Sequence, residues 1–542
     1  MKKHNIFKVV LVTMFLLLVL SWILPAAYYS GEYVDQGRVQ MGLFDLFNYP
    51  LTSLSYFGYI AMFIVFVGGF YGILYKIPAY RTFLDKIVNF SKGKEKVILS
   101  LMVILFAVLT SICGVQFGLI LFVPFVVSLI LLMGYDKIVA ALVTVGSICV
   151  GLAGSTYSFN NLNVLTSYFN LDLKYQIGVR FVILFVGIAL VIFNTLMYIK
   201  KSMIDVKIEK KTVKKAEEKV EIKEEKVSTK TVEKNSGKKT ASKASSKTGK
   251  TNSKSKTANK SSKSRKSDNK AALKDEDIIV VRETRNDNSD FVPAKVDSKH
   301  KIWPFVVTSI LLFVLFVLAF ITWGENGFGV KLFDNMTKSV SEFTLFKFPL
   351  FAKLLGTFNS FGNWTITDLF LPMAMIILIL AIIYKVKFDD IIDGFVAGAK
   401  KALAPAVIVI LIYTILVLVT YHPFQLTIYK AILGLGKGFN IVTTLVVSIL
   451  AAVFNSDMSY SFQSVIPYYT SVVTNVDNYG IAGIIFQSMY GFVMLFAPTS
   501  VVLMAALSYL GVSYKEWLKN IWKLLLELFI VLLIIFIILA LI

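Results

Sequence analysis

The sequence feature that most constrains the fold is a series of long apolar runs, some of which are interrupted by polar residues. One run extends from Ile441 to Tyr469 and contains the polar stretch Asn455–Ser464. In a bilayer, each backbone amide and carbonyl group needs a hydrogen-bond partner, so an interruption is tolerated only where it is buried in protein or lines a water-filled cavity. The stretch Asn455–Ser464 is therefore predicted to line a binding site.

A second interruption, Cys113–Gly118, divides the apolar run Val97–Met133 in the first half of the chain. The two runs align without a gap at an offset of 345 residues (437 − 92), which places Lys92 on Lys437 and Phe117 on Phe462. The same offset places Ser155 on Ser500, so that the polar stretch Gly154–Asn163 overlies Pro498–Ser500 and the residues after it. Paired interruptions in the two halves of a chain point to the substrate site of a secondary transporter.

The composition agrees with a membrane protein that crosses the bilayer many times. The 542 residues are 56% hydrophobic with a mean hydropathy of +0.70, and many apolar runs are long enough for about 30 Å of hydrocarbon. We predict an all-α polytopic protein with roughly 11–13 membrane segments, in which two inverted repeats contain interrupted helices or re-entrant hairpins. Counting the spans along the chain places the start of the run at Val97 on the cytoplasmic side and the start of the run at Ile441 on the outer side. The two repeats are therefore predicted to be inverted.

The chain divides by composition into two membrane halves, 1–200 and 301–542, separated by a Lys- and Ser-rich linker, 201–300. We expect the linker to be disordered, with a low-complexity centre at Lys238–Lys270 and a frayed helix over Val206–Val227. The net charge of +22 falls mostly in this linker. The linker is interpreted as a solvated tether; binding to anionic lipid, or to nucleic acid without sequence preference, is the alternative.

The distribution of basic residues predicts the orientation in a bacterial plasma membrane. Lys2 and Lys3 precede the first apolar run, and the loop from Lys76 to Lys96 is also basic. Since basic loops are retained in the cytoplasm, the N-terminus and the linker are predicted to be cytoplasmic, and the C-terminus to be outside.

Enzyme classes receive no support from the motifs. Two cysteines and three histidines lie scattered, and no catalytic triad, P-loop or zinc spacing is present. We therefore predict no catalytic residue, no metal site and no cofactor, apart from Na⁺ or H⁺ as a coupling ion.

Candidate site residues are the hydroxyl and amide side chains at the interruptions. Such groups bind a carboxylate together with the free N–H groups of a helix start, although Ser, Thr and Asn also hold membrane helices together. The candidates for substrate binding are Gln116, Ser155, Thr156, Asn160, Asn161, Ser456, Ser459, Ser461, Gln463, Thr499 and Ser500. Asp457 is the acidic residue within these interruptions, and it is interpreted either as a ligand for the coupling ion or as a helix cap.

Several motifs give the chain a resemblance to a known family. Trp22–Ala26, Gly134–Asp136, Pro498–Ser500 and Val512–Lys519 resemble the YfcC-like type of the C4-dicarboxylate anaerobic carrier (DcuC-type) family, within the ion-transporter superfamily. Where that family tends to have Gly-Asp before its Pro-Thr motif, this chain has Met489-Tyr490. The resemblance implies inverted repeats, hairpin tips around the substrate and an elevator-like movement.

Two functions remain open from the sequence. The first is a secondary active transporter, coupled to an ion or exchanging solutes, for a small anionic or zwitterionic substrate such as a C4-dicarboxylate or an amino acid. A homodimer is one candidate assembly for it. The alternative is a membrane scaffold without transport activity that displays the basic linker. Deletion of Lys238–Lys270 separates the two, because a transporter keeps its flux and a scaffold loses its partner.

Overall fold

The structure is a computed structural model that describes residues 4–114, 116–202, 290–295, 300–356, 358–436 and 438–541. The chain divides into two compact units, Met1–Ile199 with Arg282–Ile542 and Lys200–Val281. The second unit lies almost entirely outside the described residues, as do the predicted helix Val206–Val227 and the predicted disorder of Lys238–Lys270. The first unit contains the helices and the interruptions.

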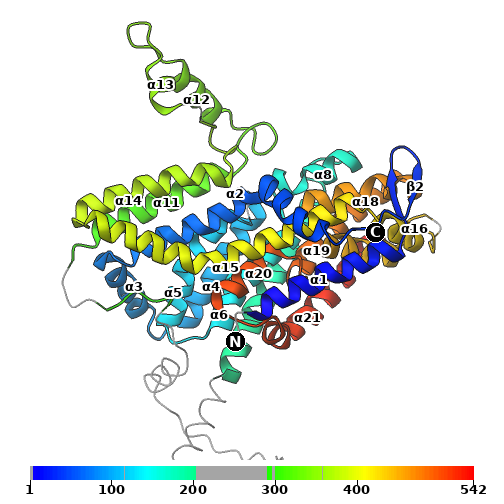
Figure 1. Ribbon diagram of the computed structural model, residues 1–542, viewed down its shortest axis with the longest axis horizontal. Coiled ribbons are helices and arrows are strands. Elements are labelled where there is room, and N and C mark those ends of the chain that lie inside the picture. Colours follow the sequence, from blue (N-terminus) through cyan, green and yellow to red (C-terminus); the bar gives the residue numbers. More distant parts are fainter. Residues whose placement is uncertain are drawn as a thin grey trace, which may run out of the picture. The chain divides into compact units, whose positions relative to one another are not determined.

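Long apolar helices dominate the first unit (Figure 1). Among the described residues, eight helices are long and apolar enough to cross a membrane, and this confirms the predicted all-α polytopic membrane protein. They are α1 (His4–Ile23), α2 (Asp45–Leu74), α4 (Glu95–Cys113), the helix Ile177–Ser202, α11 (Trp303–Phe320), η3 (Ile366–Leu369) continued by α14 (Phe370–Tyr384), α15 (Phe388–Tyr421) and α21 (Tyr514–Leu541).

Shorter helices surround the predicted interruptions. In the first half they are α3 (Pro78–Ser91), η1 (Gly118–Phe122), α5 (Val123–Leu132), α6 (Lys137–Ala141), the π-helical turn η2 (Leu142–Gly146), α7 (Ser147–Ala153) and α8 (Phe159–Phe169). In the second half they are α16 (Gln425–Leu433), α17 (Ile441–Phe454), α18 (Met458–Val472), η4 (Val476–Asn478), α19 (Tyr479–Met494) and α20 (Val501–Leu510). Both halves therefore contain broken helices where the sequence predicts them.

The offset of 345 residues relates the helices of the two halves as well as their sequences. It places α2 on α15, α3 on α16, α4 on α17, η1 and α5 on α18, α6 to α7 on α19, α8 on α20, and Ile177–Ser202 on α21. Short helices begin at or just after Pro78 and Pro423, at equivalent positions of the two halves, as α3 and α16. The repeat thus extends over consecutive helices in each half.

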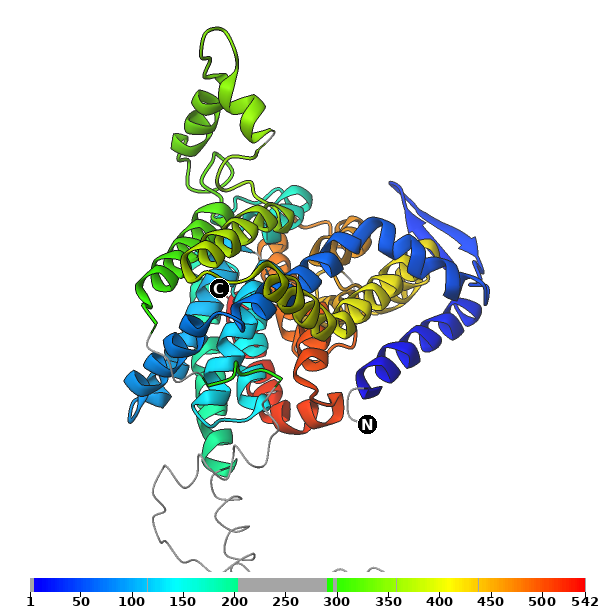
Figure 2. The same cartoon turned by 60° about the vertical axis from the view of Figure 1, so that its left-hand side comes forward.

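The equivalent helices α2 and α15 cross each other in opposite directions at four glycines (Figure 2). A Cβ atom at Gly72 would lie 2.0 Å from Gly394 O, and one at Gly398 would lie 2.0 Å from Gly68 O. Gly68, the earlier glycine of α2, faces Gly398, the later glycine of α15, so the two helices are antiparallel. Inverted repeats require their equivalent helices to be antiparallel, and small residues permit so close an approach of two backbones.

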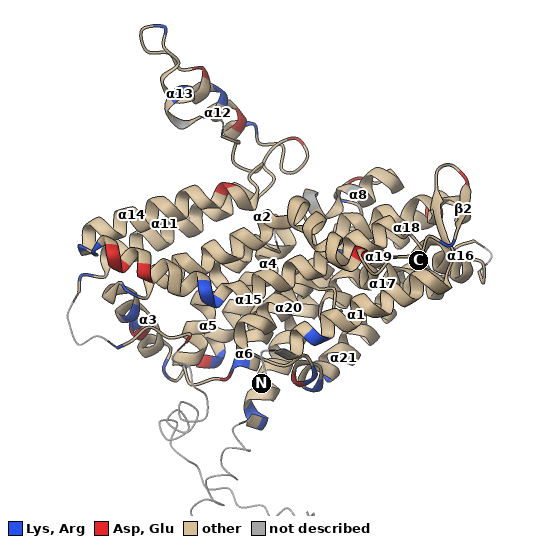
Figure 3. Ribbon diagram, in the orientation of Figure 1, with Lys and Arg blue, Asp and Glu red and all other residues tan. Residues whose placement is uncertain are grey.

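Two small features lie outside the helical bundle. The strands β1 (Ala26–Tyr29) and β2 (Tyr33–Gly37) form an antiparallel hairpin, with Tyr29 opposite Tyr33. The helices α12 (Leu332–Glu342) and α13 (Leu350–Leu355) form an arm that projects from the end of α11 (Figure 1). Charged side chains are found mostly at helix ends and in connections (Figure 3), as expected for helices that face hydrocarbon.

Candidate functional site at the helix breaks

In the first half, the two interruptions are joined by hydrogen bonds through Ser111. Its hydroxyl donates to Gly154 O at 2.7 Å and lies 2.9 Å from the hydroxyl of Thr156. The backbone N–H of Thr156 donates to Ser111 O at 3.0 Å. Gly114 ends α4 with φ +67°, and a Cβ atom there would lie 1.9 Å from the hydroxyl of Ser158. The break after α4 and the break after α7 are therefore packed on each other.

Asp457 begins α18 in the second half and acts as its N-cap. Its Oδ1 atom accepts hydrogen bonds from the backbone N–H of Ser459 at 2.9 Å and of Tyr460 at 3.3 Å. These contacts agree with the interpretation of Asp457 as a helix cap. Oδ2 has no hydrogen-bond partner among the described residues. The phenol groups of Tyr59, Tyr413 and Tyr490 lie close enough to interact electrostatically with this carboxylate.

The second-half interruption is shorter than the sequence suggests. The break comprises Asn455, Ser456 and Asp457, whereas the predicted polar stretch continues to Ser464. The cap at Asp457 starts the helix early, and the following hydroxyls bond back to its own turns, since Ser461 Oγ donates to Asp457 O at 2.9 Å. Side-chain bonds of this kind satisfy a polar residue inside a helix. Ser459, Ser461 and Gln463 therefore lie on α18, and Gln463 is exposed.

Tyr490 connects the interruptions of the two halves. It lies on α19, which is buried from Ala482 to Leu495. The hydroxyl of Tyr490 donates to Ser456 O at 3.1 Å, and the side-chain amide of Gln116 lies near the same hydroxyl. The hydroxyl of Ser456 is buried and has no partner in the described structure. A buried polar atom without a partner is costly, so its presence suggests a role in binding.

The break after α19 is stabilised by hydrogen bonds from the start of α21. Trp517 Nε1 donates to Leu495 O at 2.9 Å, and the hydroxyl of Tyr514 donates to Phe496 O. These two carbonyls would otherwise lack a partner at the end of the helix. Thr499 Oγ1 donates to Val453 O at 2.7 Å, and Ser500 is the N-cap of α20.

The corresponding break after α7 is stabilised by Arg180, from the start of the helix Ile177–Ser202. Arg180 Nη1 donates to Ser155 O at 3.4 Å and to Thr156 O at 3.1 Å, and Nη2 donates to Tyr175 O at 2.7 Å and to Leu173 O. Arg180 is only 3% exposed and its Nε atom has no partner in the described structure. In both halves, the last long helix thus supplies donors to the carbonyls at the second break.

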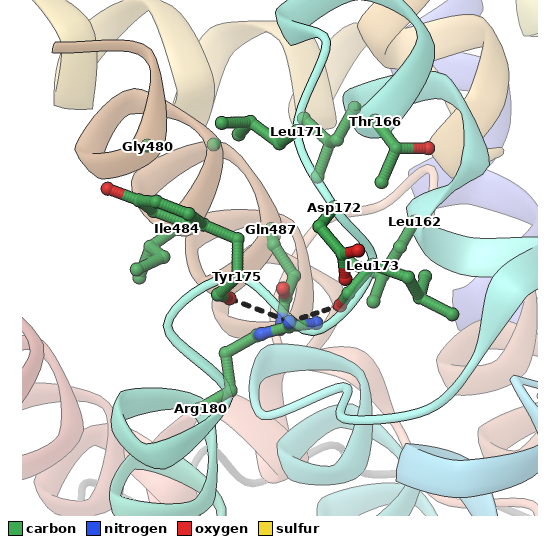
Figure 4. A pocket seen from close by; sticks show the side chains of 12 residues that line it. Leu162, Thr166, Leu171, Asp172, Leu173, Tyr175, Arg180, Gly480, Ile484 and Gln487 are labelled. Carbon is green, nitrogen blue, oxygen red and sulfur yellow. Dashed lines mark hydrogen bonds between the residues drawn. The ribbon is translucent and has the colours of Figure 1, made fainter. Parts of the chain in front are cut away.

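Arg180 and Gln487 line a small cavity, partly open to solvent, between α8, α19 and the loop before Ile177. Figure 4 shows the guanidinium beside Gln487, with the carboxylate of Asp172 near it. Gln487 Nε2 donates to Ala153 O and to Ser155 O, each at 3.1 Å. No salt bridge joins Arg180 to a carboxylate within the described residues. The cavity therefore contains a buried guanidinium, with which the carboxylate of Asp172 interacts electrostatically without a direct salt bridge.

The predicted residues fall into three groups by position. Gln116 and Ser456 meet at Tyr490, while Ser155 and Thr156 meet at Arg180. Asn161 Nδ2 donates to Ser155 Oγ at 3.1 Å, whereas the side chain of Asn160 lies outside what the structure describes. Ser459, Ser461, Thr499 and Ser500 serve the ends and turns of their helices.

The sequence analysis missed Tyr490, Gln487 and Arg180. Tyr490 and Gln487 lie inside an apolar run, where nothing in the sequence separates them from core residues. Arg180 had a usable signal, because it is a cation placed one turn into an apolar span. An ionisable residue at such a position is a functional candidate by default.

Replacing Tyr490 with Phe should weaken the junction between the two halves. The substitution removes the hydroxyl from Ser456 O and from Gln116, and leaving a buried acceptor unpaired costs about 1–3 kcal/mol. Uptake by the purified protein in proteoliposomes is expected to fall about tenfold. Tyr168→Phe, at an exposed position on α8, is the matched control. Equal uptake by Tyr490→Phe and Tyr168→Phe would show that the hydroxyl of Tyr490 has no role.

A comparison with protein families agrees with this architecture. The family model described as DcuC, C4-dicarboxylate anaerobic carrier, matches residues 35–241 and 265–541. The match covers both halves of the repeat and all four interruptions. No curated protein and no solved structure matches the chain.

Proposed function

Because the chain belongs to the C4-dicarboxylate anaerobic carrier family, we propose that it is a secondary carrier that moves a C4-dicarboxylate by ion-coupled alternating access. The family match supports a carrier function and gives no support to an enzyme. The coupling ion, the site residues and an elevator-type movement are our proposals.

One observation carries the site assignment, namely the unpartnered hydroxyl of Ser456 next to Tyr490 and Gln116. Ser456 is 2% exposed and lies in the break before α18. Its hydroxyl and the amide of Gln116 offer hydrogen-bond donors at the junction of the two halves, beside the hydroxyl of Tyr490, which donates to Ser456 O. Broken helices at matching points of two repeats usually surround the substrate. We therefore assign one substrate carboxylate to this junction.

Arg180 supplies the positive charge that a dianion needs. Burying a charge is costly, Asp172 forms no direct salt bridge with this guanidinium, and an anionic ligand would offset part of that cost. Gln487, which lines the Arg180 cavity, and Tyr490 are one helical turn apart on α19, so the cavity and the Tyr490 junction adjoin the same stretch of this helix. We assign Arg180 to the attraction of the substrate into the cavity, and Gln487 to the positioning of the break beside it.

Asp457 is proposed as the group that couples transport to an ion. Its Oδ1 atom caps α18, while Oδ2 remains available for a cation or a proton. The neighbouring hydroxyl of Ser456 is a second oxygen ligand without a partner. Oxygen ligands of this kind suit Na⁺, and a carboxylate shielded from water suits a proton.

The arrangement of the helices supports the predicted orientation and an elevator-type movement. The start of α1 and the end of the helix Ile177–Ser202 lie at the same face, opposite the α12–α13 arm (Figures 1 and 2). The interrupted helices pack on one another, α4 on α7, α17 on α19 and α7 on α19, while α2 packs along α15. We propose that the interrupted helices move as a transport domain against a scaffold that includes the α2–α15 pair.

The test is uptake of radiolabelled succinate by the full chain in proteoliposomes, with imposed Na⁺ and pH gradients. Accumulation that needs one of these gradients is expected. Deletion of Lys238–Lys270 should leave the flux unchanged, because the linker contributes no described residue to the breaks. A well-folded protein that transports and binds no C4-dicarboxylate would overturn the proposal, and binding is measured by thermal stabilisation.

Replacing Arg180 with Gln should weaken substrate binding more than folding. A hydrogen bond to a charged group contributes about 1.5–3 kcal/mol, so the half-saturating succinate concentration should rise about tenfold or more. Arg180→Lys keeps the charge and should retain much of the affinity. Lys174→Gln removes an exposed cation from the same loop and serves as the control. An unchanged half-saturation in a stable Arg180→Gln protein would limit Arg180 to holding the carbonyls.

A further inference from the structure

The linker is anchored to the membrane unit near its C-terminal end, through Phe291. This side chain is 7% exposed although the sequence before it is strongly hydrophilic. The carbonyl of Phe291 accepts two hydrogen bonds, from the hydroxyl of Tyr75 at 2.8 Å and from the hydroxyl of Ser128 at 2.6 Å. The backbone of a loosely attached tether would bond to water instead. A carbonyl held by two side-chain donors belongs to a formed site.

The ring of Phe291 also has specific contacts. Lys137 Nζ lies 4.6 Å from the ring centroid, in the position of a cation–π interaction. The ring of Tyr509 meets it edge to face, with the centroids 5.3 Å apart. The pocket therefore recognises an aromatic side chain through a cation and an aromatic ring, and it recognises the peptide group through two hydroxyls.

Both flanks of Phe291 are held as well. Lys401 Nζ donates to Asp290 O at 2.7 Å and lies 3.8 Å from a carboxylate oxygen of Asp290. Arg81 Nη1 donates to Pro293 O at 2.7 Å, while its Nε atom bonds to Asp85 at 3.0 Å. Three of the four residues from Asp290 to Pro293 are thus bound, through backbone carbonyls, one carboxylate and one ring.

The contacts come from two groups of helices. Tyr75 follows α2, Arg81 lies on α3 and Lys401 on α15, all outside the interrupted helices. Ser128 lies on α5, Lys137 begins α6 and Tyr509 lies on α20, next to the breaks. We propose that this pocket is a peptide-binding site for the chain's own segment Asp290–Pro293, and that the bound segment is a strap that slows the movement of the second group against the first.

The strap rests on the proposed function, because it acts only if these two groups of helices move relative to each other during transport. A bound segment that touches both groups must break its contacts with one of them when they separate. The free energy of those contacts then adds to the barrier for movement. Coupling free energies between parts of a protein typically change rates by about 2- to 30-fold.

Phe291→Ala in the full-length protein tests the strap. The maximal rate of succinate uptake should rise about threefold or more, with an unchanged half-saturating concentration, because the substrate site is not altered. Trypsin should cleave after the exposed Lys295 faster than in the wild type. Val292→Ala, at a half-buried neighbouring position, is the matched control and should keep the wild-type rate and cleavage.

A synthetic peptide of residues 290–295 provides a second test that does not depend on the folding of one variant. Added to the Phe291→Ala protein, the peptide should bind and return the uptake rate toward that of the wild type. The same peptide with Ala in place of Phe should have no effect. Equal uptake by wild-type and Phe291→Ala protein would overturn the strap, and failure of the peptide to bind would overturn the site. If the wild type transports no succinate, the proposed function is wrong. Binding of the peptide would still show whether the pocket is a peptide-binding site.

Discussion

Asp457→Asn is expected to reduce gradient-driven uptake about 10- to 100-fold while the amount and the melting temperature of the folded protein stay close to those of the wild type. Asn is as good an N-cap as Asp, so the hydrogen bonds to Ser459 and Tyr460 can persist. The substitution therefore removes the charge and leaves the cap. A hydrogen bond or ion contact to a charged group contributes about 1.5–3 kcal/mol, which gives the stated range. Uptake with and without the Na⁺ or pH gradient is the measurement.

The control for this prediction is Asn440→Ala. Asn440 caps α17 in the same way, accepting from Val442 N at 2.8 Å and from Thr443 N at 3.2 Å, but it lies at the far end of that helix from the break. Loss of this cap should cost about 1 kcal/mol of stability and leave the coupling of uptake to the gradient intact. If Asp457→Asn retained full coupling, Asp457 would be a cap and nothing more.

Gly72→Leu and Gly398→Leu are each expected to abolish the recovery of folded protein. A Cβ atom at either position would lie 2.0 Å from a backbone carbonyl oxygen of the facing helix. A backbone group cannot rotate away as a side chain can, so the two helices would have to separate. Overpacking usually costs about 1–3 kcal/mol, and a clash between two backbones should exceed that range. The yield of monodisperse protein in detergent and its melting temperature are the measurements.

Gly178→Leu provides a matched control for the glycine crossing. Gly178 also lies in an apolar helix, Ile177–Ser202, but a Cβ atom there has no neighbour within 4 Å. The same substitution should therefore leave yield and melting temperature near their wild-type values. Normal yields for Gly72→Leu and Gly398→Leu would mean that α2 and α15 do not meet at these glycines.

The architecture was largely predictable, because the repeat leaves a trace in the sequence that does not depend on detailed packing. Lys92 and Lys437 establish an offset that also pairs α2 with α15 and α4 with α17. The interruptions were predictable for a related reason, since a polar stretch within an apolar run has few uses in a bilayer. Gly114 and Asp457 mark the end of one helix and the start of another, as the sequence indicates.

The details of the candidate site were less predictable, since they depend on contacts between distant parts of the chain. Tyr490 lies in an apolar run, and only the fold shows that its hydroxyl joins Gln116 to Ser456. The sequence predicts an interruption that continues to Ser464, but the N-cap at Asp457 begins α18, and the residues from Met458 onward are helical. Local pattern thus located the breaks, whereas the partner of each polar group followed from tertiary structure.

Different donors hold the second break in each half of the carrier, so the two halves differ in charge at this point. One half uses the guanidinium of Arg180 on Ser155 O and Thr156 O, and the other uses the indole and phenol of Trp517 and Tyr514 on Leu495 O and Phe496 O. The first arrangement adds a full positive charge, and the second adds only dipoles. In the proposed mechanism, a negatively charged solute between these halves would meet an asymmetric electrostatic potential, even though the helices around it belong to a sequence repeat.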